Sequence, residues 1–139
     1  AVIDASGKIM TPGYVDINSH GAWEKSFDDG PDCIDVARAG HAMHGTTRQV
    51  CSLITNPIDV QCENLRNVRA KMDQRPDILG AHLEGPFLAL SRKGAHDPEC
   101  LKDPVPEIVD RMLEAADGCL RQITIAPELP HGLRICSTR

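Results

Sequence analysis

The segment Ile78-Leu79-Gly80-Ala81-His82-Leu83-Glu84, followed by Gly85-Pro86, decides the fold class. The run is mostly apolar, too short for a typical helix, and ended by a glycine-proline pair, so we expect a strand. Side chains of a strand alternate between its two faces, which puts His82 and Glu84 on one face and Leu83 on the other. In a closed barrel the first face lines the interior and the second packs against helices.

Three more strands are expected outside this segment. Apolar and polar residues alternate over residues 14–21, which predicts a strand with a period of two. Residues 46–55 are rich in β-branched side chains and favour a second strand. Residues 122–128 are expected to form the last strand, after the one that ends at Glu84.

Helices are expected between these strands. Asp32 is the expected N-cap of the first helix, which runs to His44. Asn56 is the expected N-cap of the second helix, with Pro57 at its first position. The third helix begins after Pro104. The second helix has the clearest apolar face, formed by Ile58, Cys62, Leu65, Val68 and Met72.

Regular alternation of strand and helix indicates an α/β protein with a parallel sheet. Four strands are half of the eight in a (β/α) barrel, which typically has about 250 residues. We therefore expect residues 12–139 to be a truncated, first half of a TIM-type (β/α) barrel. Residues 1–11 resemble the close of a strand and a turn, and are expected to be the end of an N-terminal β segment, the remnant of a small β domain.

Composition excludes several classes of function. The chain has 139 residues and a net charge of −5, with no basic block of the kind that binds nucleic acid. The longest uncharged run, residues 49–58, is far shorter than the ~18 apolar residues of a membrane-spanning helix. The six cysteines form no CxxC pair and the first residues do not resemble a signal peptide, so we expect reduced thiols in a cytoplasmic protein.

Polar residues at the strand ends are the candidate site. Reactive groups in α/β barrels lie at the carboxyl ends of the strands, where the chain has Asn18, His20, Glu84 and Glu128. A carboxylate directed into a barrel is costly unless it is paired or bound to a cation, which makes Glu84 a candidate metal ligand. His20 is a second candidate ligand. The alternatives are an ordinary ion pair for Glu84 and a hydrogen-bonded, structural role for His20. Glu128 is expected to pair within the barrel.

Five short motifs occur one after another along the chain. They are Thr11-Pro12-Gly13-Tyr14-Val15-Asp16-Ile17, His44-Gly45-Thr46-Thr47, His82-Leu83-Glu84-Gly85-Pro86-Phe87, Lys93-Gly94-Ala95-His96-Asp97-Pro98 and Thr124-Ile125-Ala126-Pro127-Glu128. Together they resemble N-acetylglucosamine-6-phosphate deacetylases of the amidohydrolase superfamily, over nearly the whole chain. The resemblance implies that Glu84 holds a catalytic divalent metal, and that Ala95 and His96 contact the amino-sugar phosphate.

The reaction implied by this resemblance is hydrolysis of the acetamide of N-acetylglucosamine 6-phosphate to glucosamine 6-phosphate and acetate. A divalent metal suits amide hydrolysis because it lowers the pKa of a bound water to about 7 and polarises the carbonyl. One carboxylate ligand fits zinc, iron or manganese, while Asn18 in place of a histidine argues against a second metal.

The remaining parts of the family's site are expected outside this sequence. In the family, two metal histidines and the aspartate that acts as general base and acid lie on later strands, so we expect no catalytic residue here and an inactive isolated chain. The parent enzyme is expected to be a homo-oligomer. Residues 133–139 show no helix pattern, although a helix should follow the last strand, which indicates truncation or a shifted reading frame.

Two other functions stay open from the sequence. One is a different amidohydrolase, acting on a cyclic amide. The other is a non-catalytic remnant that binds a sugar phosphate or a partner half-barrel.

Overall fold

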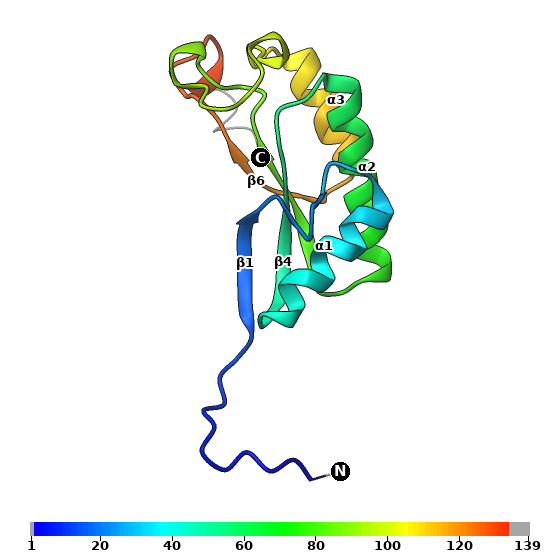
Figure 1. Cartoon of the computed structure of the whole chain (residues 1–139). Helices are drawn as coiled ribbons and strands as arrows, with labels where there is room; N and C mark the ends of the chain where they lie inside the picture. Colours follow the sequence, from blue (N-terminus) through cyan, green and yellow to red (C-terminus); the bar gives the residue numbers. More distant parts are fainter. Residues whose placement is uncertain (1, 134–139) are drawn as a thin grey trace.

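A parallel sheet covered by helices on one side makes up the computed structural model, which describes residues 2–133 (Figure 1). The sheet has the strand order β1-β4-β5-β6, and all three strand pairs are parallel. Its strands are β1 (Tyr14–Ser19), β4 (Thr46–Leu53), β5 (Ile78–Glu84) and β6 (Leu120–Thr124). The described α-helices are α1 (Pro31–Met43), α2 (Ile58–Gln74) and α3 (Pro106–Ala116). The α/β class predicted from the sequence is therefore confirmed.

Short elements fill two of the connections. A small antiparallel pair, β2 (Gly21–Ala22) and β3 (Lys25–Ser26), follows β1 and was not expected from the sequence. The long loop between β5 and α3 contains two 3-10 turns, η1 (Leu90–Arg92) and η2 (Pro98–Cys100). None of the helices within residues 2–133 has the length and apolar character needed to cross a membrane.

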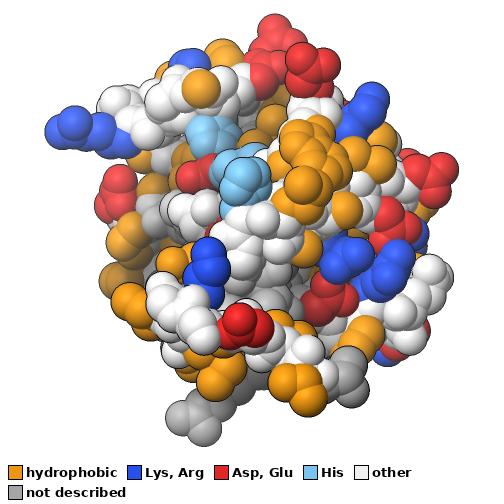
Figure 2. Space-filling view, turned by 60° about the horizontal axis from the view of Figure 1, so that its bottom comes forward, with side chains coloured by type: hydrophobic (Ala, Val, Ile, Leu, Met, Phe, Trp, Pro, Cys, Tyr) orange, Lys and Arg blue, Asp and Glu red, His pale blue; other side chains and the backbone are white. Residues whose placement is uncertain are grey.

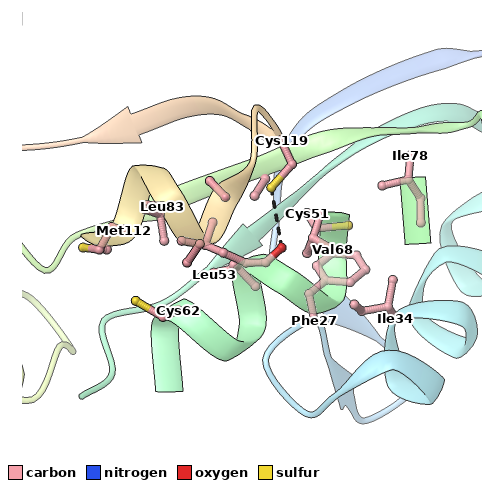
Figure 3. Close-up of a cluster of buried hydrophobic side chains, with 14 of the residues drawn as sticks. Phe27, Ile34, Cys51, Leu53, Cys62, Val68, Ile78, Leu83, Met112 and Cys119 are labelled. Atoms are coloured by element: carbon pink, nitrogen blue, oxygen red, sulfur yellow. Dashed lines mark hydrogen bonds between the residues drawn. The ribbon is translucent and has the colours of Figure 1, made fainter. Parts of the chain in front are cut away.

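The apolar core lies between the sheet and the helices (Figure 3). The predicted face of α2 is confirmed, because Cys62, Leu65 and Val68 are buried and Ile58 and Met72 pack against the same cluster. From the sheet, Leu53 and Leu83 enter this core, and from the other helices Ile34 and Met112 do so. Burial of each large aliphatic side chain stabilises the fold by about 1.5–3 kcal/mol.

Both helix caps expected from the sequence are wrong. Gly30, with a φ of 99°, is the N-cap of α1, so Asp32 lies in the first turn, where its charge is favourable to the helix dipole. Pro57 is the N-cap of α2. The side chain of Asn56 instead donates to Asp28 Oδ1 at 3.3 Å. It therefore pairs with a residue distant in the sequence and does not cap its own helix.

The last strand of the sheet also differs from expectation. β6 begins at Leu120 and ends at Thr124, because it pairs with β5 from Ala81 to Glu84 and stops where β5 stops. Residues 125–128 are therefore not strand. Residues 2–13 lie in no helix or strand and are exposed, and the expectation that residues 1–11 end a preceding β segment stays a prediction. The expectation for residues 134–139 lies outside the described residues.

On the face of the sheet opposite Leu83, a polar row joins the four strands. Ser52 Oγ donates to Asn18 Oδ1 at 3.4 Å and has no second hydrogen, so it accepts from His82 Nδ1 at 2.9 Å. His82 Nε2 then accepts from Thr124 Oγ1 at 2.8 Å. Burial lowers the pKa of His82 and the nearby His20 adds to this, so the neutral ring is favoured, although Glu84 opposes the shift.

This row predicts a pH-dependent stability. Because the folded state lowers the pKa of His82, the unfolded state binds the proton first. The contribution of His82 is present above an unfolded pKa of about 6.5, and it is lost as pH falls toward the lower folded value. Urea unfolding of the wild type at pH 7.5 and pH 5.5 should therefore give a smaller free energy of unfolding at pH 5.5.

Two variants isolate the contribution of His82. His82→Gln should show a smaller pH-dependent loss than the wild type, because the titrating ring is gone. His44→Gln, at the exposed end of α1, should keep the wild-type loss. An identical pH dependence in the wild type and in His82→Gln would contradict this account of the polar row.

Candidate functional site

A pocket of about 460 Å³ opens where β1, β4 and β5 end. It is lined by His20, Ile54, Thr55, Asn56, Glu84, Ala95, His96 and Asp97. The first four residues directly follow β1 or β4, Glu84 ends β5, and the others come from the loop before α3. On the face drawn in Figure 2, histidine side chains lie beside an acidic one. The pocket therefore occupies the carboxyl-terminal edge of the parallel sheet, as the sequence predicted.

The carboxylate of Glu84 lies between two imidazoles. Its Oε2 is 3.0 Å from His20 Nε2 and 3.9 Å from His96 Nε2. The side chain of Glu84 is 30% exposed, and those of His20 and His96 are 39% and 15% exposed. The strand end, the turn after β1 and the long loop thus bring together three of the residues predicted for the site.

Three possible donor atoms for a divalent cation lie close together at this point. Nitrogen and oxygen ligands lie about 2.1 Å from such ions, so two ligands of one ion are at most about twice that distance apart. The distances from Glu84 Oε2 to His20 Nε2 and to His96 Nε2 are both below this limit. His20 Nδ1 is buried and has no hydrogen-bond partner among the described residues. Within residues 2–133, however, no group of three or more His, Cys, Asp or Glu is arranged to hold a metal ion. The described residues therefore fit part of a coordination sphere.

A half-buried hydrogen-bond network anchors the loop after β4. Asp28 Oδ1 accepts from the side-chain amides of Asn56 and Asn64, at 3.3 and 3.2 Å, and its Oδ2 accepts from the amide of Ile54 at 3.3 Å. Burial raises the pKa of Asp28, and these hydrogen bonds to the carboxylate oppose that effect. The network fixes the backbone that carries Thr55 into the pocket.

Thr55, Asn56 and Asp97 line the pocket but were not predicted as site residues. Thr55 and Asn56 follow β4, so the rule that places functional groups at strand ends could have found them. No such signal marks Asp28, because the residues by which it anchors the loop after β4 lie between 26 and 36 residues further along the chain.

Lys93 and Glu128 are not among the residues that line the pocket. Lys93 Nζ donates to the carbonyls of His96 and Gly94, at 2.9 and 3.2 Å, and so stabilises the loop that carries Ala95 and His96. Glu128 was expected to pair within the barrel, but it is exposed in the turn after β6 and is not among the residues that line the pocket.

Comparisons with known proteins show what the chain resembles in sequence. No family model matches the chain. An N-acetylglucosamine-6-phosphate deacetylase of Lysinibacillus sphaericus is 30% identical over 94% of this chain and 35% of its own length. An N-acetylgalactosamine-6-phosphate deacetylase of Escherichia coli O157:H7 is 26% identical over 96% of this chain and 37% of its own length.

A solved structure extends the likeness to the fold. It is a variant of the Mycobacterium smegmatis N-acetyl-D-glucosamine-6-phosphate deacetylase in complex with N-acetyl-D-glucosamine-6-phosphate, and it matches with a TM-score of 0.85 and 36% identity. The match covers 89% of this chain and 32% of that protein. The chain thus spans about a third of the length of the relatives it matches. In sequence and in fold, it is a homologue of the N-acetylglucosamine-6-phosphate deacetylases and corresponds to part of their structure.

Proposed function

We propose that the chain is the part of an N-acetylglucosamine-6-phosphate deacetylase that holds one metal ligand and part of the substrate site. The observation that carries the proposal is the convergence of Glu84, His20 and His96 on one pocket, in a chain that matches deacetylases over most of its length. Glu84 is the metal ligand and His20 a second ligand. Ala95 and His96 contact the phosphorylated amino sugar that is the substrate, since both line the pocket beside Glu84.

The donor set accounts for the proposed chemistry. A divalent metal at this place supplies a Lewis acid for the amide carbonyl and an activated water for hydrolysis. Glu84 offers a hard, anionic oxygen and His20 an imidazole nitrogen, a pair of donors that zinc, iron and manganese all accept. His20 Nδ1 is buried and has no hydrogen-bond partner among the described residues, so a group from another part of the parent enzyme is proposed to hold that ring.

We further propose that residues 12–139 are the first half of the barrel domain and residues 1–11 the end of a preceding β segment.

The only carboxylates that line the pocket in the described residues are Glu84 and Asp97. Asp97 accepts from the backbone amide of Glu99 at 3.0 Å and caps η2. The aspartate that serves as general base and acid is therefore assigned to another part of the parent enzyme.

The compartment and the oligomeric state of the parent enzyme are also proposals. The five described cysteines, Cys33, Cys51, Cys62, Cys100 and Cys119, are free thiols, which suits a reducing compartment such as the cytoplasm. We expect the parent enzyme to be a homo-oligomer, as proposed from its family resemblance.

A second candidate substrate is N-acetylgalactosamine 6-phosphate. The Escherichia coli relative, 26% identical to this chain, is named for that sugar, which differs only in the orientation of one ring hydroxyl. Acetate release from both phosphosugars, measured with a protein that contains this segment in a complete barrel, separates the two. The proposal expects faster turnover of N-acetylglucosamine 6-phosphate.

Glu84→Gln tests the metal site. The change keeps the size of the side chain and removes its charge, so binding of Mn²⁺ or Zn²⁺ to the 139-residue chain should weaken by at least about tenfold, or ~1.4 kcal/mol. Isothermal titration calorimetry measures this. Glu128→Gln removes an exposed carboxylate away from the pocket and should leave the affinity unchanged. Equal affinity in Glu84→Gln and the wild type would exclude Glu84 as a ligand.

Activity of the isolated chain is a separate prediction. With N-acetylglucosamine 6-phosphate and Zn²⁺, the purified 139 residues should release no acetate above the background, because the proton carrier is assigned to another part of the enzyme. A coupled assay for acetate measures this. Turnover comparable to that of a full-length deacetylase would show that the catalytic groups lie within this chain.

A further inference from the structure

Thr55 joins two parts of the pocket through a single hydroxyl. It follows β4 and its side chain is buried, with the residue 5% exposed. Its Oγ1 lies 3.0 Å from the carbonyl oxygen of Glu84 and 2.8 Å from His96 Nδ1. The hydroxyl therefore connects the end of β5 to the loop that carries His96.

The number of hydrogens on this hydroxyl determines the direction of both hydrogen bonds. Thr55 Oγ1 has one hydrogen, and the carbonyl of Glu84 can only accept, so that hydrogen is donated to Glu84. The remaining lone pairs of Thr55 Oγ1 can only accept, so His96 Nδ1 must be the donor in the second contact. If Thr55 instead donated its hydrogen to His96 Nδ1, lone pairs of Thr55 Oγ1 and of the Glu84 carbonyl oxygen would face each other at 3.0 Å in a buried position, which is unfavourable.

Gly85 permits this close contact. A Cβ at Gly85 would lie 2.1 Å from Thr55 Oγ1, far inside van der Waals contact, and the φ of Gly85 is +88°, a conformation that side chains disfavour. The glycine of the His82–Phe87 motif thus leaves space for the hydroxyl between β4 and β5.

We propose that Thr55 is a positioning residue that holds His96 in the tautomer protonated at Nδ1. In this tautomer the Nε2 of His96 faces Glu84 Oε2, 3.9 Å away, with a free lone pair. A neutral His96 then accepts a hydrogen bond from a ligand hydroxyl or amide N–H and offers no donor to a phosphate oxygen. The role as a substrate contact rests on the proposed function, whereas the tautomer itself does not.

Nuclear magnetic resonance of the ¹⁵N-histidine-labelled 139-residue chain tests the proposal without substrate or metal. At pH 9, where imidazoles are as a rule neutral, a bare ring nitrogen resonates far downfield of a protonated one. His96→Gln assigns the His96 signals by their loss. In the wild type, Nδ1 of His96 should have the shift of a protonated nitrogen and Nε2 that of a bare one.

Two variants at Thr55 separate the hydroxyl from the shape of the side chain. Thr55→Val keeps the shape and should exchange the two shifts, because free imidazole side chains in water prefer the proton on Nε2. Thr55→Ser keeps the hydroxyl and should retain the wild-type shifts. A proton on Nε2 in the wild type, or unchanged shifts in Thr55→Val, would overturn the proposal. If Thr55→Val does not fold, the wild type and Thr55→Ser still decide.

These results are independent of the proposed function. If His96 carries its proton on Nδ1 but metal binding does not depend on Glu84, the role of Thr55 is retained and the metal site is rejected. If metal binding depends on Glu84 but the proton of His96 is on Nε2, the metal site is retained and the role of Thr55 is rejected.

Discussion

Parallel pairing of β5 between β4 and β6 is the constraint on which the site depends. The register places Ser52 beside His82 on one side and Thr124 beside Glu84 on the other. Because strand side chains alternate, the same register directs Leu83 into the core and Glu84 toward the pocket. A shift by one residue would bury the carboxylate among the helices and expose the leucine, so the core and the site are fixed together.

Hydroxyl groups organise the polar side of this sheet. Each of Ser52 and Thr55 has one hydrogen to donate, and each donates it to an oxygen that cannot return one. Both hydroxyls therefore accept from a histidine Nδ1, that of His82 in the row across the strands and that of His96 at the pocket. The Glu84 carboxylate then lies close to His96, whose ring is oriented by Thr55, and this limits reorganisation of that ring when a cation or ligand binds.

Much of the fold followed from periodicity, because burial on one face leaves a regular pattern in sequence. The face of α2 and the alternation of His82, Leu83 and Glu84 are examples. Features set by distant partners could not be predicted this way. Asn56 bonds to Asp28 rather than capping its own helix, and β6 ends where β5 ends. At the site, the sequence pointed to Glu84, His20, Ala95 and His96, which all line one pocket, but not to Thr55, whose role depends on contacts between three separate segments.

The central claim is that Glu84 marks a metal site at the carboxyl ends of the strands. The most direct measurement is anomalous X-ray diffraction from crystals of this chain grown with Zn²⁺, recorded on both sides of the zinc absorption edge. The account predicts an edge-dependent peak next to Glu84 Oε2, within coordination distance of an imidazole of His20 or His96. Zinc found only at other residues, with Glu84 still paired directly to His20, would contradict it.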